Sequence, residues 1–502
     1  MKKTTKIATA ALAAAMSLIP LASCGGDNSN TPGNSATEVQ VYFWKSGYGS
    51  DFMDEIVDAF NKKQSEYKVT LEIESDAKTI IQSLSLGSSN TYDLYFTMLN
   101  TNQYNKEFIK LDDILDYTVA GESMSIREKY YDYLLKGVKN DDGTTNFLTY
   151  GNGWCGIVYN KDVIDGVKYQ LPRTTQELNK LTAKIKNDTS LSDVQAPWLF
   201  YRNADNNGYL QYIAYAWEAQ YDGLDYYYNT MLALKDENGN TPSKEVFTAK
   251  DGRYQALKVL ESIISSDTVH SSVTDDNFTN VQRKFLKGEA AFMVNGSWLM
   301  NESTGTKSNF GMMKTPVIST IVEKLENTAM TDKTLAAIVD EVDAGKTSSE
   351  LCSDNDFARI KEARNILYNN GAEHYVFIPE YSSAIEGSKE FLKYFYSDEG
   401  IAKFMEVTGL PNSAKLSDES KFDASSLDAW HKIQMDLSKE VTAVTNTITK
   451  SKLYIDKNVN QFANLHYAQA LCADNETNKL SADDLWERII AKINENWVDW
   501  SK

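Results

Sequence analysis

Hydrophobic and polar residues change their period repeatedly along the first hundred positions. Residues 39–44 and 67–74 alternate apolar and polar side chains, which predicts two β-strands. Residues 52–60 repeat apolar side chains at helical spacing, and residues 77–86 do the same before a third apolar run at 92–98. This β-α-β-α-β order predicts an α/β fold with a parallel, doubly wound sheet and right-handed crossovers.

Three later segments interrupt this order. Glycines flank Asn152 inside the extended run 138–164, a strand leads directly into Asn295–Gly296, and residues 394–400 separate two helical patterns. Such breaks allow the backbone to leave one sheet and enter another. We therefore predict two sheet-based lobes joined by several crossings. Further helices are predicted over residues 175–186, 209–219, 253–264 and 481–500.

Residues 317–373 do not fit the repeating order. They contain short helical patterns at 322–325, 335–342 and 357–367, separated by polar and charged residues. We interpret this segment as an elaboration on one lobe.

The N-terminus has the pattern of a bacterial export signal. Three lysines precede an apolar run over residues 7–21, which is shorter than the about 20 residues of a membrane-spanning helix. Leu-Ala-Ser then precedes Cys24, which resembles a lipobox, so residues 1–23 are expected to be removed and Cys24 to be lipid-modified. The alternative is an ordinary secreted signal with a chance cysteine. Residues 24–38, rich in Gly, Ser, Asn and Thr, are predicted to form the anchor and a flexible linker.

Composition narrows the function classes. The chain has 502 residues, of which 42% are hydrophobic, enough for two or three domains. With 70 acidic against 51 basic residues, the formal net charge is −19, which argues against nucleic-acid binding. Beyond Cys24, we expect free and mostly buried thiols at Cys155, Cys352 and Cys472. The four histidines show no metal-ligand spacing, and we expect neither a metal nor another cofactor.

Motifs typical of common enzyme classes are missing from the sequence. It contains no HExxH, GxSxG, P-loop or CxxC pattern. Segment 236–247 begins like a calcium loop but lacks the glycine and the closing glutamate of one, so we interpret it as a polar turn. A carboxylate pair for glycoside hydrolysis stays open as an alternative, because many of the 70 acidic residues could supply one.

Aromatic residues gather at the ends of predicted strands and beside the predicted crossings. In open α/β sheets, ligands bind beyond the carboxyl ends of the strands. Aromatic faces cover the apolar side of a sugar ring, while amide, lysine and carboxylate groups bond its hydroxyls. The predicted ligand-binding residues are Trp44, Lys45, Tyr48, Tyr95, Asn152, Trp154, Tyr201, Trp217, Asn295 and Trp298.

These aromatic residues also have a packing interpretation. Trp44 and Trp154 stand next to glycines or at strand ends, which favours ligand contact. Trp217, Trp298 and Tyr201 fit a core position equally well. Elsewhere, packing is expected for Trp430, Trp486, Trp497 and Trp500.

Five stretches carry a resemblance to a known family: VYFWKSGYGSDFMDEIVDAFNKK, YDLYF, TYGNGWCGIVYNKDVI, KFLKGEAAFMVNGSWLM and EGSKEFLKYFYSDEGIAKFMEVTGLPNSAK. Through them the chain resembles the family 1 extracellular solute-binding proteins of bacterial ABC transporters, the group that contains maltose-binding protein. The stretches follow the order of the family and cover most of the chain after the export signal.

The resemblance implies a two-lobed periplasmic-binding-protein fold of type II, in which three hinge crossings join two doubly wound sheets. The implied crossings lie near Gly151–Trp154, Ala290–Asn295 and Phe395–Glu399. Lobe 1 would comprise residues 39–151 plus 295–396, with the insertion 317–373, and lobe 2 residues 152–294 plus 397–502. Maltose-binding relatives lack this insertion. By position, the resemblance places these residues at ligand or hinge positions: Trp44, Lys45, Asn152, Trp154, Asn295 and Trp298.

The resemblance implies a binding protein and not an enzyme. Such a protein is the lipid-anchored, extracytoplasmic component of an ABC importer, and it captures a carbohydrate, commonly an oligosaccharide, by closure of two lobes. The expected partners are permease subunits with a separate ATPase, and the expected state is a monomer on the outer face of the cell membrane, held by Cys24. Two alternatives remain: a cell-surface glycan-active enzyme such as a glycoside hydrolase, and a glycan sensor or adhesin without a transport role.

Overall fold

The computed structural model describes most of the chain beyond residue 35. The described ranges are 36–97, 107–140, 142–164, 168–201, 208–235, 238–274, 276–302, 309–446, 470–472 and 479–501. The predicted export signal, Cys24 and nearly all of the predicted linker lie outside these ranges. Within the ranges, no helix is both long enough and apolar enough to cross a membrane.

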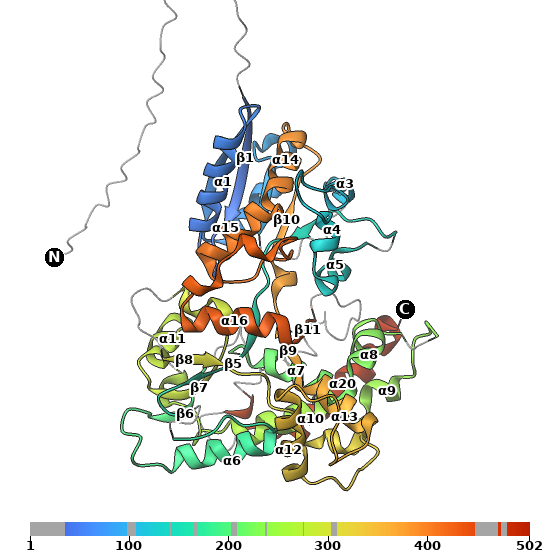
Figure 1. Cartoon of the computed structure of the whole chain (residues 1–502). Helices are drawn as coiled ribbons and strands as arrows, with labels where there is room; N and C mark the ends of the chain where they lie inside the picture. The colour runs from blue at the N-terminus through green and yellow to red at the C-terminus, as the bar shows by residue number, and fades with distance from the viewer. Residues whose placement is uncertain are drawn as a thin grey trace, which may run out of the picture.

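The first sheet has five strands and forms the upper body in Figure 1. Its strand order is β2 (Tyr67–Glu74), β1 (Thr37–Trp44), β3 (Leu94–Thr97), β10 (Tyr375–Phe377) and β4 (Leu148–Thr149). β1 pairs in parallel with β2 and β3, which confirms the parallel arrangement predicted from the sequence. β10 is antiparallel to both β3 and β4.

Amphipathic helices pack around this sheet, each with its apolar face inward. α1 (Asp51–Lys63) buries the five side chains of the predicted apolar face: Phe52, Met53, Ile56, Val57 and Phe60. The other helices of this body are α2 (Ala77–Leu84), α3 (Asp112–Leu115), α4 (Ile126–Lys129), α5 (Asp132–Val138), α14 (Ile385–Phe395) and α15 (Asp398–Thr408). The first sheet and these helices are called the first lobe.

The second sheet has six strands and forms the lower body in Figure 1. Its main order is β11 (Thr442–Val444), β9 (Ile366–Asn369), β5 (Trp154–Asn160), β7 (Ala290–Gly296) and β6 (Ala196–Trp198), and β8 (Phe310–Met312) also pairs with β5. Every residue of β5 and β7 is buried, because helices cover both faces of this sheet.

The helices around the second sheet complete the second lobe. They are α6 (Thr175–Lys186), α7 (Leu210–Asp222), α8 (Leu224–Tyr226), α9 (Lys244–Thr248), α10 (Gly252–Ile263), α11 (Phe278–Leu286), α12 (Asp332–Asp343), α13 (Asp354–Arg364), α16 (Ala429–Glu440) and α20 (Ala482–Trp500). α7 is the central helix, since nearly all its residues are buried and it contacts β5, β9 and α10. The four helices predicted at 175–186, 209–219, 253–264 and 481–500 are confirmed within three residues at each end.

Three segments connect the two lobes. Residues 150–153 lead from β4 to β5, where the sequence analysis placed a crossing. Residues 370–374 lead back from β9 to β10. Residues 409–428 lead from α15, which packs on α1, to α16, which packs on β8 and β5. The crossings predicted near 290–295 and 395–399 are therefore wrong, and so are the lobe boundaries based on them.

Both errors have a physical reason. β7 stays in the second sheet because it pairs antiparallel with β5, and Asn295–Gly296 ends it ahead of a 3₁₀ turn (Ser297–Met300) in the same lobe. Residues 395–399 form a corner between α14 and α15, where the Ser397 hydroxyl caps α15. Residues 297–302 and 309–369, with most of the 317–373 segment, thus belong to the second lobe, and residues 375–408 belong to the first.

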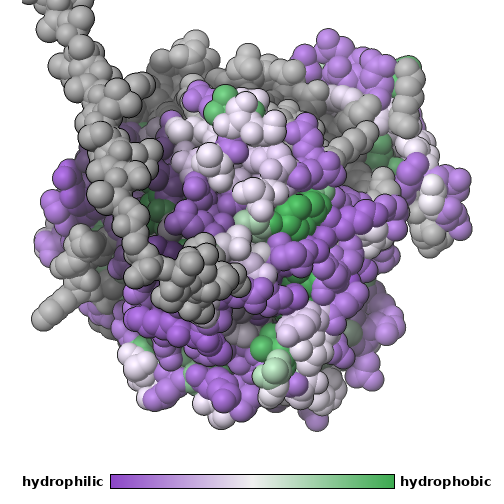
Figure 2. Space-filling view, turned by 90° about the horizontal axis from the view of Figure 1, so that it is seen from above, coloured by the Kyte–Doolittle hydropathy of each residue, from purple (hydrophilic) through white to green (hydrophobic). Residues whose placement is uncertain are grey.

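Seen from above the first lobe, hydrophilic residues dominate and hydrophobic residues form small separate groups (Figure 2). Cys155 and Cys472 are buried and Cys352 is partly buried, and no disulfide joins these three thiols, as the sequence predicted.

Candidate ligand-binding site

A cavity of about 500 Å³ lies between the two lobes, a size typical of sites that hold small molecules. Its walls come from three parts of the chain: the carboxyl ends of β1 and β2, the segments around the start of α7 and after β7, and the crossing 370–374. Ligands of open α/β sheets bind at such carboxyl ends. Its position therefore marks this cavity as the candidate site.

The first lobe contributes three consecutive features to the cavity wall. Trp44 is the last residue of β1, and its indole Nε1 donates to the Ser75 carbonyl oxygen at 3.2 Å, which holds the half-buried ring in place. Lys45 follows and is exposed at the rim. Tyr48 is buried, with its ring centroid 4.6 Å from that of the His374 imidazole.

The second lobe contributes a cluster of aromatic rings and a carboxylate. Tyr209 stands edge-on to Trp298 at 6.1 Å and stacks on Tyr212 at 5.0 Å. The backbone of Tyr209 has φ of 62°, a left-handed conformation that is rare for a bulky residue and that costs about 1–2 kcal/mol. Glu302 places a carboxylate beside these rings.

The two walls approach each other closely at Gly47. A Cβ atom on Gly47 of the first lobe would lie 2.7 Å from the ring of Trp298 in the second lobe. Only glycine therefore fits at this position in the arrangement observed here.

The crossing 370–374 supplies the polar part of the cavity. Burial raises the pKa of Glu373 to about 7 and lowers the pKa of His374 to about 4, so the imidazole is neutral at physiological pH. Three side chains of the lining carry buried polar atoms without a hydrogen-bond partner in the described part of the chain: Tyr48 Oη, Asn370 Oδ1 and His374 Nδ1. Unpaired buried polar groups are costly, which favours a ligand or solvent molecule that reaches them.

Together these groups can hold a ring that has an apolar face and several hydroxyls. Indole and phenol rings stand on both walls, and carboxylate, amide and imidazole groups stand between them. Among the residues that the structure describes, no three His, Cys, Asp or Glu side chains are placed to hold a metal ion.

The Glu373→Gln variant is expected to change the pH dependence of stability in the ligand-free protein. The pKa of Glu373 is about 7 in the folded state, above the ordinary value of 4.5, so the folded state binds a proton more tightly than the unfolded state. The contribution of Glu373 to the free energy of unfolding is fully present below about pH 4.5, and it is lost as the pH rises through about 7.

Melting temperatures of both proteins between about pH 5 and 8 measure this effect, since the variant lacks the titrating group. The wild-type protein should lose several degrees relative to the variant across that range. His374, whose pKa is lowered to about 4, contributes a pH dependence of the opposite sign, but both proteins contain it and it cancels in the comparison. Parallel pH profiles of the two proteins would contradict the expected raised pKa.

Four predicted ligand-binding residues line the cavity: Trp44, Lys45, Tyr48 and Trp298. Two others lie elsewhere in or near the first lobe. Tyr95 is buried against Phe377 with ring centroids 5.3 Å apart. The Asn152 amide oxygen accepts hydrogen bonds from Tyr133 and from Asn369, each at 2.6 Å, and so joins the two crossing strands.

The remaining four predicted residues lie in the second lobe and do not line the cavity. Trp154 is 1% exposed within the core of β5, and Trp217 is fully buried with its Nε1 donating to the Pro316 carbonyl oxygen at 3.0 Å. The Asn295 side-chain oxygen accepts from the Gly296 amide at 2.7 Å. Tyr201 is half-buried in the core cluster that contains Trp154.

Nine other cavity residues were not predicted from the sequence: Ser46, Gly47, Ser75, Tyr209, Tyr212, Glu302, Asn370, Glu373 and His374. A usable signal existed for the crossing 370–374, because the apolar run Ile366–Tyr368 leads into Asn-Asn-Gly and a second apolar run follows at Tyr375. This strand-turn-strand pattern matches the one around Asn152. It lay inside the segment interpreted as an insertion.

Comparison with known families gives a match over most of the chain. Residues 55–427 match the model of a family described as bacterial extracellular solute-binding protein. A maltooligosaccharide ABC transporter solute-binding lipoprotein of Streptococcus pneumoniae is 24% identical over 441 residues, covering 83% of this chain and 89% of the relative. A galactooligosaccharide-binding protein of Bacillus subtilis is 25% identical over 337 residues, covering 65% of this chain and 70% of the relative.

Solved structures share the fold at low sequence identity. The cyclic alpha-maltosyl-1,6-maltose binding protein of Arthrobacter globiformis matches with a TM-score of 0.59 at 14% identity, covering 92% of this chain and 98% of that protein. The GacH receptor of Streptomyces glaucescens matches with a TM-score of 0.59 at 13% identity, covering 93% and 99%. The structure thus has the type II periplasmic-binding-protein fold expected from the sequence.

Proposed function

The chain belongs to the bacterial extracellular solute-binding proteins, and we propose that its solute is a carbohydrate, specifically an oligosaccharide. Proteins of this kind bind their ligand outside the cytoplasm and work with an ABC permease. The relatives named above support a sugar ligand by their own descriptions, maltooligosaccharide and galactooligosaccharide.

The observation that carries the proposal is the placement of aromatic rings on both walls of the cavity. Trp44 stands on the first lobe, and Trp298, Tyr209 and Tyr212 stand on the second. Rings on opposite walls suit a ligand with apolar faces, such as a chain of pyranoses. The carboxyl group of Glu373, which lies between the walls, can form hydrogen bonds with the hydroxyl groups of such a sugar.

Closure of the lobes would follow from contacts on both walls. A sugar that touches both lobes stabilises the arrangement in which they approach, by the free energy of the contacts across the cleft. The crossing strands are tightly packed, since the Asn370 amide donates to the Gly153 carbonyl oxygen at 3.0 Å and a Cβ on Gly371 would lie 2.6 Å from the Gly151 carbonyl oxygen. A permease would then recognise the closed form.

The remaining features of the proposal concern the place of the protein in the cell. We infer that Cys24 carries a lipid which holds a monomer at the outer face of the cell membrane. Permease subunits and a separate ATPase would complete the importer. The lipobox-like sequence before Cys24 supports the anchor.

The Trp44→Ala variant is expected to bind the oligosaccharide at least about tenfold more weakly than the wild-type protein, because it loses one aromatic wall of the cavity. The ligand is first identified with a thermal-shift panel of xylo-, malto-, manno-, fructo- and galacto-oligosaccharides, since a tight ligand raises the melting temperature by mass action. Calorimetric titration of that ligand then compares the two proteins.

Trp497→Ala is the matched control. Trp497 is half-buried in α20 against Phe247, so its loss exposes a similar surface without touching the cavity, and sugar affinity should not change. Equal affinity of wild type and Trp44→Ala would contradict the proposed site. Release of reducing ends during incubation with the sugar would show that the protein hydrolyses the sugar, and it would overturn the proposal that the protein only binds it.

A further inference from the structure

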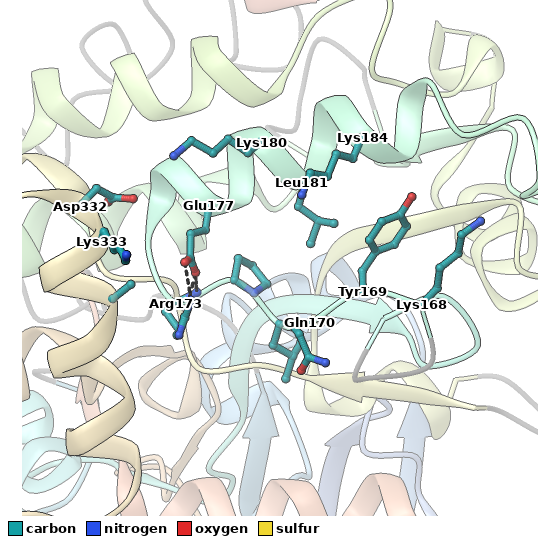
Figure 3. Close-up of a pocket in the computed structure, with 13 residues that line it drawn as sticks. Lys168, Tyr169, Gln170, Arg173, Glu177, Lys180, Leu181, Lys184, Asp332 and Lys333 are labelled. Carbon is teal, nitrogen blue, oxygen red and sulfur yellow. Dashed lines mark hydrogen bonds and ion pairs between the residues drawn. The ribbon is translucent and has the colours of Figure 1, made fainter.

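A second recess lies on the second lobe, away from the cavity between the lobes. It has a volume of about 600 Å³ and is formed by residues 168–173, α6 and α12 (Figure 3). α12 comes from the segment 317–373, which we interpreted as an insertion. An ion pair between Arg173 and Asp340 attaches α12 to the segment 168–173. We call this recess the α6–α12 groove.

The floor of the α6–α12 groove is apolar. Pro172, Leu181 and Ala336 are buried beneath it, and Tyr169 and Leu171 are partly buried at its edge. The Tyr169 hydroxyl donates to Asp188 at 2.6 Å, so the ring is fixed in position. A ligand without apolar groups would gain no binding free energy by covering this apolar floor.

The rim of the groove is strongly basic, although the chain as a whole carries a net charge of −19. Five basic residues line the groove against two acidic ones, Glu177 and Asp332. Two of the basic residues are neutralised locally, because Lys168 pairs with Asp188 and Arg173 pairs with Glu177.

The other three, Lys180, Lys184 and Lys333, make no ion pair among the residues that the structure describes. All three are exposed, and they project from the two helices that flank the groove (Figure 3). Lys180 and Lys184 are four residues apart on α6, so they lie on one face at a spacing of about 6 Å along the helix axis.

We propose that the α6–α12 groove is a docking site for an acidic, amphipathic helical segment of a partner protein. Carboxylates four residues apart on such a helix match the spacing of Lys180 and Lys184, and the Lys333 ammonium meets the opposite flank of the segment. Apolar residues between the carboxylates cover the floor of Leu181 and Ala336. The apolar floor favours a protein segment over a lipid headgroup or a polyphosphate, whose anionic groups need only the lysines.

The test uses the full chain and a labelled helical peptide of Leu, Ala and Glu in which the Glu residues recur at i and i+4. Fluorescence anisotropy measures its dissociation constant at about 50 mM and about 300 mM salt. The triple variant K180E/K184E/K333E should bind this peptide at least about tenfold more weakly at low salt, and the wild-type affinity should fall as salt rises.

The control variant K68E/K287E/K439E changes the net charge by the same amount. These three lysines are exposed, make no ion pair in the described structure and lie outside the groove, so peptide affinity should change less than about twofold. A peptide with Gln in place of Glu should not bind. Equal losses in both triple variants would mean that net charge alone attracts the peptide and would overturn the proposal.

A second arm separates the partner classes. Groove-dependent binding to phosphatidylglycerol vesicles, without binding of the acidic peptide, would overturn the proposal in favour of a lipid surface. The thermal shift caused by the sugar should be the same in K180E/K184E/K333E and wild type, so failure of this proposal leaves the sugar-binding proposal untouched. Absence of peptide binding to the wild-type chain at millimolar concentration would also overturn it.

Discussion

The Trp154→Ala variant is expected to lose about 3–5 kcal/mol of its free energy of unfolding. Trp154 is 1% exposed at the start of β5 and belongs to an apolar cluster with Val158, Leu299 and Leu367. Truncation of so large a buried side chain removes its transfer free energy and leaves a cavity, because the closely packed surroundings relax only in part. Urea unfolding followed by circular dichroism measures the loss.

Trp154 was predicted to contact the ligand, so the same variant tests that prediction. Affinity per folded molecule should stay within about threefold of wild type, because the indole does not line the cavity. Trp44→Ala is the comparison, with lost affinity and a nearly unchanged melting temperature. A Trp154→Ala protein of wild-type stability that no longer bound sugar would place this indole at the ligand instead.

Local elements were predictable because each depends on residues close in sequence. The apolar face of α1 follows from helical spacing alone, and all five of its side chains are buried. α20 begins directly after Ser481, the first residue of the predicted helix 481–500, and Ser481 and Asp484 form a capping box.

The crossings were harder to predict because they depend on pairing between distant strands. Gly-containing breaks beside Asn152 and Asn295 look alike in sequence, but only the first leaves its sheet. β7 reaches Gly296 paired with β5, and that pairing is invisible in the local pattern. The return crossing at 370–374 depends on β10 joining β3, about 280 residues away in the chain.

The site was predictable only in part for a related reason. Trp44 and Trp154 both stand at strand ends, yet the side-chain direction decides whether a ring faces the cleft or the core. Trp44 faces the cavity and Trp154 faces a cluster on the second lobe. Glu373 and His374 enter the site only because the crossing 370–374 brings them there, and no spacing within the sequence links them to Trp44.

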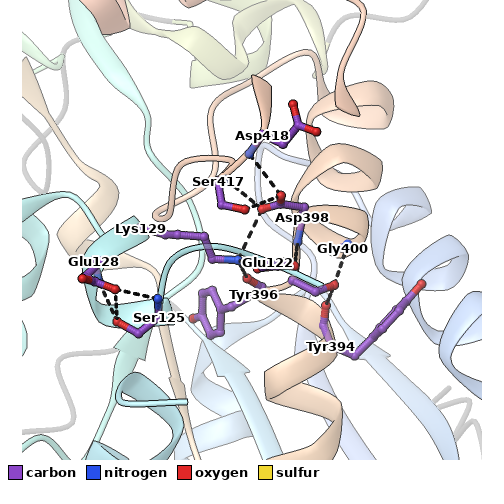
Figure 4. A network of polar contacts seen from close by, with 11 residues as sticks. Glu122, Ser125, Glu128, Lys129, Tyr394, Tyr396, Asp398, Gly400, Ser417 and Asp418 are labelled. Carbon is purple, nitrogen blue, oxygen red and sulfur yellow. Dashed lines mark hydrogen bonds and ion pairs between the residues drawn. The ribbon is translucent and has the colours of Figure 1, made fainter. Parts of the chain in front are cut away.

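The Lys129→Met variant is expected to lose about 3–5 kcal/mol of its free energy of unfolding, because it leaves buried carboxylates without their cation. Lys129 is fully buried, and its Nζ contacts Glu122 at 2.5 Å, the Tyr396 carbonyl oxygen at 2.5 Å and Asp398 at 3.4 Å (Figure 4). Asp398 also accepts hydrogen bonds from Ser417, so this network joins two parts of the first lobe to the crossing 409–428.

The pH dependence of that loss identifies its cause. Burial alone would raise the pKa of Asp398, but hydrogen bonds from Ser417 and the charge of Lys129 hold this pKa below its ordinary value of 3.8. The ionised Asp398 therefore stabilises the fold above about pH 3.8, and this stabilisation is lost as the pH falls further. Without the ammonium, Glu122 and Asp398 repel each other when both are ionised, and protonation of one relieves the repulsion. The deficit of Lys129→Met should therefore be larger at about pH 7 than at about pH 4.5, and Glu122→Gln added to it should restore part of the stability.

Lys62→Met is the matched control on the same lobe. Its ion pair with Asp58 is open to solvent, with side-chain exposures of 80% and 75%, and its loss should cost less than about 0.5 kcal/mol. A Lys129→Met deficit that is equal at both pH values would indicate that the lysine acts through the packing of its aliphatic chain and not through its charge. We expect the charge to matter, because the Lys129 Nζ makes three polar contacts at the corner of α14 and α15.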